Sequence, residues 1–67
     1  MHILVNGKQQ PLDSEHLSLA ELIQRLGFAE KKIAVALNQE FVPKSERESI
    51  VLSDGDDVEI VAPMQGG

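Results

Sequence analysis

The stretch LSLAELIQRLG, residues 17–27, decides the fold because it predicts a helix with a defined start and a defined end. Its apolar side chains recur at i, i+3, i+4 and i+7 and form one stripe: Leu19, Leu22, Ile23 and Leu26. Ser18 and Glu21 have the spacing of a capping box, in which each side chain accepts a hydrogen bond from the backbone amide of the other. Gly27 can adopt the left-handed conformation that ends a helix. We therefore expect a helix from about Leu19 to Leu26.

Two strands joined by a tight turn are expected before this helix. The segment HILVN, residues 2–6, is expected to form a strand with Ile3 and Val5 on one face. Asn6-Gly7 is a strong hairpin signal, because both central residues of a type I′ turn have positive φ. A second strand should run from about residue 8 to residue 12. Pro11 has no amide to donate, so this strand belongs at an edge of the sheet.

Two further strands are expected after the helix. The segment IAVAL, residues 33–37, alternates large and small side chains, which is typical of an interior strand with its large residues turned toward the core. A short turn at residues 38–39 leads to EFV, residues 40–42. Pro43 ends this strand.

The remaining segment contains a loop, a turn and a final strand. Residues 44–49 are polar and should form a loop with one helical turn. The apolar residues 50–52 should then return to the core. The sequence DGD, residues 54–56, predicts a turn. The last strand is DVEIV, residues 57–61, with its two internal aliphatic residues turned inward.

The order of these elements predicts an α+β fold. One helical crossover supplies only one parallel pair of strands, so a doubly wound sheet is excluded. A mixed sheet of four to five strands packed on one main helix is the β-grasp, or ubiquitin-like, architecture, in which the first and last strands are parallel and central. We expect residues 1–61 to form this domain and residues 62–67 to form a flexible tail.

Composition and charge exclude several classes of protein. The chain has 67 residues, no Cys and a formal net charge of −5, and the whole acidic excess lies in residues 34–67. An acidic surface repels phosphate backbones, so nucleic-acid binding is not expected. The apolar run of residues 3–5 is too short for a signal peptide or a membrane span. We therefore expect a soluble, cytoplasmic protein that is a monomer when alone.

Metal sites and catalytic groups find no support in the sequence. His2 and His16 are far apart, and neither has a Cys or a second His at ligand spacing. The three aspartates around Gly55 lack the spacing of a calcium loop, so a tight turn is the better interpretation. No bound cofactor and no catalytic residue are expected, and the chain is not expected to be an enzyme.

The terminal Gly66-Gly67 is the candidate functional feature. A tail without bulky side chains can enter a narrow channel and present its carboxylate to an enzyme, with Met64 and Gln65 following it into the partner. A carboxylate is a poor electrophile until ATP converts it to an acyl-adenylate, so a partner must activate it. Chain ends are also often frayed, and an incidental glycine pair is the alternative.

Four motifs, in order, resemble the ThiS family of sulfur carriers in thiamine biosynthesis. They are VALN at residues 35–38, VP at 42–43, DGDDVEIV at 54–61 and the diglycine at 66–67. The chain departs mildly from the family at Lys44, where Arg is common, and in having no aromatic residue between Pro43 and Ile50.

The resemblance implies a reaction cycle in which the chain is a co-substrate. A ThiF-type enzyme adenylates the Gly67 carboxylate with ATP and magnesium. A sulfur donor such as a cysteine desulfurase persulfide converts the adenylate to a thiocarboxylate, and thiazole synthase accepts the sulfur.

The partner interface is expected on the sheet face that points away from the helix. If the alternating residues of the strands face the helix as predicted, their neighbours share the outer face: Leu4, Ala34, Ala36, Glu59 and Val61. Leu4 and Val61 are the expected apolar anchors, although scattered exposed apolar residues are also normal.

Three other functions stay open. The small subunit of molybdopterin synthase resembles the chain in fold and carries a diglycine thiocarboxylate. A ubiquitin-type modifier would instead end as an isopeptide on lysine. A plain interaction domain would have an incidental diglycine.

Overall fold

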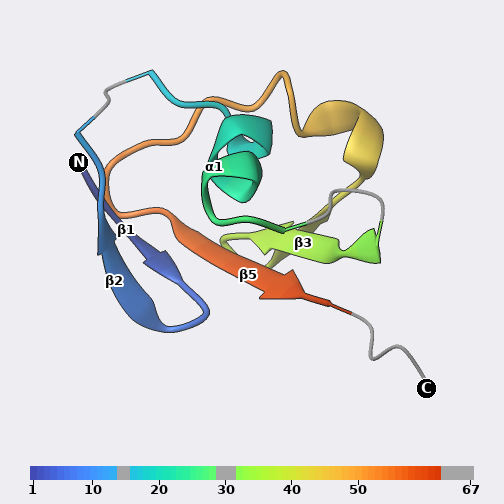
Figure 1. Cartoon of the computed structure of the whole chain (residues 1–67), viewed down its shortest axis with the longest axis horizontal. Coiled ribbons are helices and arrows are strands. Elements are labelled where there is room, and N and C mark those ends of the chain that lie inside the picture. The colour runs from blue at the N-terminus through green and yellow to red at the C-terminus, as the bar shows by residue number, and fades with distance from the viewer. Residues whose placement is uncertain (14–15, 29–31, 63–67) are drawn as a thin grey trace.

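The computed structural model describes residues 1–13, 16–28 and 32–62. Within them the chain forms one α-helix, a short 3-10 helix and five strands in the order β1 (His2–Val5), β2 (Lys8–Pro11), α1 (Leu19–Arg25), β3 (Ala34–Leu37), β4 (Glu40–Val42), η2 (Lys44–Glu46) and β5 (Asp57–Val61). The strands make a single sheet in the order β2-β1-β5-β3-β4. Figure 1 shows α1 lying across one face of this sheet.

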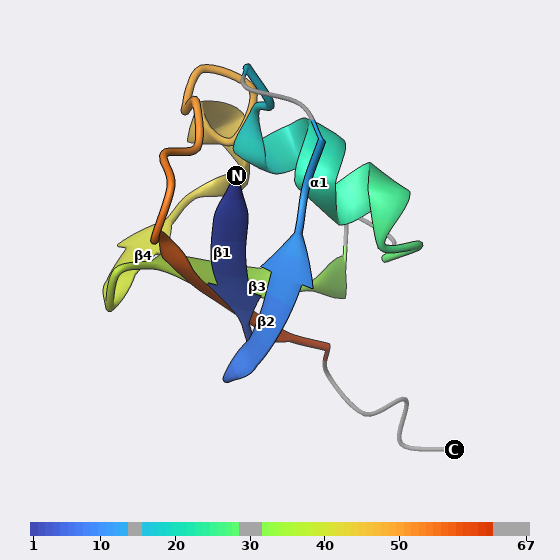
Figure 2. The same cartoon turned by 90° about the vertical axis from the view of Figure 1, so that its left-hand side faces the viewer.

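The sheet is mixed, as predicted. β1 pairs in parallel with β5, and every other pair is antiparallel. Figure 2 views the molecule from the side of the β1–β2 hairpin, with α1 above the sheet. The α+β, β-grasp prediction is confirmed, including the central parallel pair and the edge position of β2.

The helix begins and ends at the predicted signals. The Ser18 and Glu21 side chains accept from each other's amides at 3.1 and 3.0 Å, which completes the capping box. Hydrogen bonding of the Glu21 carboxylate to the Ser18 backbone amide, and secondly to the Ser18 side chain, lowers the pKa of Glu21 below its ordinary value of 4.5. α1 ends at Arg25, one residue earlier than predicted, because Leu26 is the C-cap. Gly27 follows with φ of 83°, as a Schellman cap requires.

The core lies between α1 and the sheet. Leu19, Leu22 and Ile23 are completely buried on the inner side of the helix. They pack against buried residues of the sheet and of the connecting segments: Ile3, Leu17, Val35, Val42, Leu52, Val58 and Ile60. The described part of the chain contains no helix with the length and hydrophobicity that a membrane span requires.

The exposure of Val51 shows that one prediction was wrong. Residues 50–52 were all expected in the core, but Val51 is 57% exposed, whereas Leu52 is buried. Val51 forms an antiparallel bridge with Ser18. The Leu52 amide donates to the Leu17 carbonyl at 2.9 Å, and the Leu19 amide donates to the Ile50 carbonyl at 2.9 Å. Successive side chains of an extended segment point to opposite sides, so Val51 faces away from the core.

The polar segment of residues 44–49 contains the predicted helical turn, η2, and one buried residue that was not expected. Arg47 is only 3% exposed. Its Nη2 atom donates to the Ile33 carbonyl at 2.9 Å, and its own carbonyl accepts from the Ala20 amide at 3.0 Å. Arg47 therefore connects η2 to the residues just before β3 and to the first turn of α1.

Candidate functional site: the outer sheet face and the carrier terminus

The strand register places the five predicted interface residues on the sheet face opposite α1. Ala34 pairs with Val61, and Ala36 pairs with Glu59. Leu4 lies between Gln9 of β2 and Asp57 of β5. Their neighbours along the strands are the buried core residues, so the alternation turns this set outward.

Phe41 is an outer-face residue that the sequence analysis missed. It lies opposite Ala36 on β4 and is 69% exposed. Its neighbour Val42 pairs with Val35 and points into the core. The missed signal was the length of the turn, since a two-residue turn at Asn38 and Gln39 sets Phe41 opposite Ala36. A residue opposite an outward-facing alanine must also face outward.

One half of the outer face is apolar. Phe41 and Val61, which is 62% exposed, stand on either side of Ala34 and Ala36. Because the alanine side chains are small, the surface between Phe41 and Val61 is a shallow depression. Such a surface can receive apolar side chains of a partner, and large exposed apolar groups that share one face indicate an interaction site.

The other half of the outer face is acidic. Leu4 is half-buried there and lines a hollow of about 400 Å³ together with Asn6, Gly7, Asp57 and Glu59. The two carboxylates give this hollow a negative charge beside an apolar side chain. The arrangement suits the aliphatic stem and charged head of a lysine or an arginine.

The predicted carrier terminus begins beside this face. β5 ends at Val61, and Ala62 is the last described residue. The predicted tail residues Met64, Gln65, Gly66 and Gly67 lie outside the described residues. Six residues, 62–67, can span roughly 20 Å when extended. A partner bound to the outer face could therefore receive the terminal carboxylate at a site well inside its own surface.

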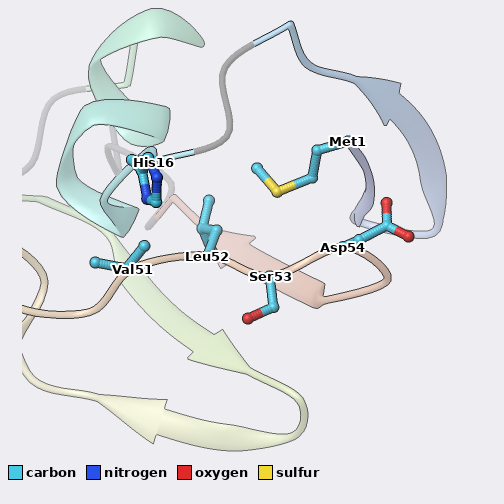
Figure 3. A pocket seen from close by; sticks show the side chains of 6 residues that line it. All are labelled: Met1, His16, Val51, Leu52, Ser53 and Asp54. Carbon is cyan, nitrogen blue, oxygen red and sulfur yellow. The ribbon is translucent and has the colours of Figure 1, made fainter.

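A larger hollow than the one beside Leu4 lies elsewhere in the described structure. It has a volume of about 570 Å³ and is lined by Met1, His16, Val51, Leu52, Ser53 and Asp54. Figure 3 shows the His16 ring on one side of this hollow and the Asp54 carboxylate on the other, with Leu52 and Ser53 between them. Asp54 Oδ1 accepts from the His2 amide at 2.7 Å and so holds the start of β1. This hollow does not present an acid-base pair.

The aspartates around Gly55 also hold backbone in place. Asp56 Oδ2 accepts from the Ser53 amide at 2.7 Å, and its Oδ1 accepts from Asn38 Nδ2 at 3.1 Å. Gly55 has φ of 87°, as the predicted turn requires. Among the described residues, no three His, Cys, Asp or Glu side chains are grouped as a metal ion would need.

Comparison with known proteins gives consistent relatives over nearly the whole chain. The ThiS family model matches residues 3–67. The sulfur carrier protein ThiS of Thermus thermophilus is 40% identical over 65 residues, which are 97% of this chain and 98% of that protein. A thiazole synthase of Paramagnetospirillum magneticum is 37% identical over 67 residues, and the chain spans 20% of its length.

A solved structure agrees with these sequence matches. The crystal structure of the thiamine biosynthesis protein ThiS from Geobacter metallireducens superposes with a TM-score of 0.86 at 35% identity, and each chain is covered completely, at 100%. Fold, motif order and sequence identity point in the same direction. The chain belongs to the ThiS family.

Proposed function

We propose that this chain is a sulfur carrier of thiamine biosynthesis whose Gly67 carboxylate becomes a thiocarboxylate and donates sulfur to the thiazole ring. Family membership over residues 3–67 carries the proposal. The diglycine at residues 66–67 and the exposed apolar side chain of Val61 at the end of β5 support it.

The chemistry needs three steps at the carboxyl carbon and its substituents. In the first, a carboxylate oxygen attacks the α-phosphorus of ATP, which forms the acyl-adenylate and releases pyrophosphate. In the second, a persulfide sulfur attacks the activated carbonyl and AMP leaves. A thiol of the donor then cleaves the resulting acyl disulfide, which leaves the thiocarboxylate on the carrier and a disulfide on the donor. ATP and magnesium belong to the activating partner, so the carrier itself is a co-substrate without a bound cofactor.

We assign partner docking to the outer sheet face. The surface consists of the five predicted residues Leu4, Ala34, Ala36, Glu59 and Val61, together with Phe41. The apolar half would anchor the partner, and the acidic half would attract a basic surface and raise the rate of association. A ThiF-type adenylating enzyme and thiazole synthase would use this face in turn. The match to a segment of a thiazole synthase supports that acceptor.

Intact mass spectrometry tests the proposal. The full chain is incubated with a ThiF-type enzyme, ATP, magnesium and a cysteine desulfurase with cysteine. The expected product is the carrier with one oxygen replaced by sulfur, and the chain that lacks Gly67 should gain nothing. Conjugation to lysine side chains in the same mixture would favour a protein modifier. A thiocarboxylate that gives up its sulfur together with the large subunit of molybdopterin synthase, and not to thiazole synthase, would favour the molybdenum cofactor pathway.

A further inference from the structure

The side chain of Asn6 binds the backbone of the last strand. Its Oδ1 atom accepts a hydrogen bond from the Ile60 amide at 2.8 Å, and its Nδ2 atom donates to the Ile60 carbonyl at 3.2 Å. Both bonds are partly buried and join residues that are 54 positions apart in the chain. One side-chain amide therefore satisfies both backbone groups of Ile60.

This amide continues the pairing of β1 with β5 beyond the end of β1. The Asn6 backbone amide donates to the Val58 carbonyl at 2.9 Å. In a parallel ladder, the next bond would run from the Ile60 amide to the main-chain carbonyl of Asn6. The turn at Asn6 and Gly7, with φ of 52° and 82°, directs the chain away into β2. The side-chain carbonyl of Asn6 takes the place of the main-chain one.

The position of this contact matters because β5 ends one residue later. Val61 pairs with Ala34 on the side of β3. The end of β5 is therefore held by backbone pairing on one side and by the Asn6 amide on the other. The proposed tail starts at the next residue, Ala62.

We propose that Asn6 is a positioning residue of the carrier reaction, whose amide sets the point at which the reactive tail leaves the domain. This inference rests on the proposed function. Without the amide, the last residues of β5 are held only by their pairing with β3, so they fray more easily. Each residue that frays from the sheet changes the reach of the carboxylate by up to about 3.5 Å. Adenylation needs the carboxylate in near-attack geometry, so a variable starting point lowers the rate.

Asn38 provides a matched control at the other end of β5. Its Oδ1 atom accepts from the Asp57 amide at 3.0 Å, and its Nδ2 atom donates to Asp56 at 3.1 Å. Its φ is 50°, close to the 52° of Asn6. Replacement of either asparagine by glycine removes two side-chain hydrogen bonds and preserves the left-handed backbone. Only the replacement at Asn6 removes hydrogen bonds from the end of β5 that leads to the tail.

The experiment measures ATP–pyrophosphate exchange by a ThiF-type enzyme with the full chain and with Asn6→Gly, Asn6→Asp and Asn38→Gly. Asn6→Gly should lower kcat about three- to tenfold with KM changed by less than about twofold, because Leu4 and the two carboxylates of the acidic hollow remain in place. Asn38→Gly should keep the kcat of the unchanged chain. Asn6→Asp, which keeps the acceptor for the Ile60 amide, should give an intermediate kcat. In parallel, amide hydrogen exchange at Ile60 should accelerate in Asn6→Gly.

Three results would overturn the inference. One is a folded Asn6→Gly protein with the same kcat as Asn38→Gly. Another is a raised KM with unchanged kcat, which would make Asn6 a docking contact. The third is an Ile60 amide that exchanges at the same rate with and without the Asn6 side chain. If Asn6→Gly does not fold, the same comparison is made with Asn6→Asp. Failure of the proposed function is a different result, in which the unchanged chain itself supports no exchange.

Discussion

Replacement of Phe41 by alanine tests the docking face most directly. The ring is 69% exposed, so its removal should change the free energy of unfolding by less than about 0.5 kcal/mol. A phenylalanine contributes roughly 200 Å² when fully covered. Cover over the 69% now exposed would therefore remove about 140 Å² from water, worth roughly 3.5 kcal/mol at 25 cal/mol/Å². Ordering costs offset part of this gain, so we expect Phe41→Ala to weaken binding by about 1–2 kcal/mol, roughly five- to thirtyfold.

The assay compares two variants that each remove an exposed apolar side chain. Titration calorimetry with the ThiF-type enzyme gives Kd, and pyrophosphate exchange gives KM. Val51→Ala is the control, because Val51 is 57% exposed but lines the hollow beside His16 and not the outer sheet face. Phe41→Ala should raise Kd and KM, and Val51→Ala should change neither. The reasoning is refuted if Phe41→Ala binds as tightly as the unchanged chain, or if both variants lose the same affinity.

Further predictions concern the core, the terminus and the helix cap. Leu22 is completely buried in the core cluster, so Leu22→Ala should lower the free energy of unfolding by about 2–5 kcal/mol in urea denaturation, and an unchanged midpoint would contradict its place in the core. Deletion of Gly67 should leave the melting temperature unchanged and abolish both pyrophosphate exchange and thiocarboxylate formation. Gly66→Val should reduce both reactions less completely, because a branched side chain obstructs a narrow channel. Sulfur transfer to the truncated chain would refute the carrier role. The hydrogen bonds from Ser18 lower the pKa of Glu21, so the ionised carboxylate stabilises the fold above the ordinary value of 4.5 and this contribution is lost as pH falls through the lowered value. The stability advantage over Glu21→Gln should thus be constant at neutral pH and shrink in acid, and an advantage that persists at pH 2 would contradict this assignment.

The sequence alone predicted the elements whose signals are local. Ser18 and Glu21 are three residues apart, and their capping box depends on little beyond the first turn of the helix. The Asn6-Gly7 turn likewise depends on the backbone preferences of two adjacent residues. The order of these elements then left few ways to build a sheet around one helix, so the β-grasp topology followed. The chemistry proposed for Gly67 came from the order of motifs along the chain and from the family resemblance that these motifs carry.

Tertiary structure decided which side chains face outward or reach distant backbone. Within EFV, the order of residues does not show whether Phe41 or Val42 faces the core; the pairing of β4 with β3, whose register depends on the two-residue turn between them, does. Val51 is exposed because its segment pairs with Ser18, and Arg47 is buried because its guanidinium meets the Ile33 carbonyl. The bond between the Asn6 side chain and Ile60 spans 54 positions in the chain. Contacts of this kind leave no periodic pattern in the sequence, since they exist only after the strands have been brought side by side.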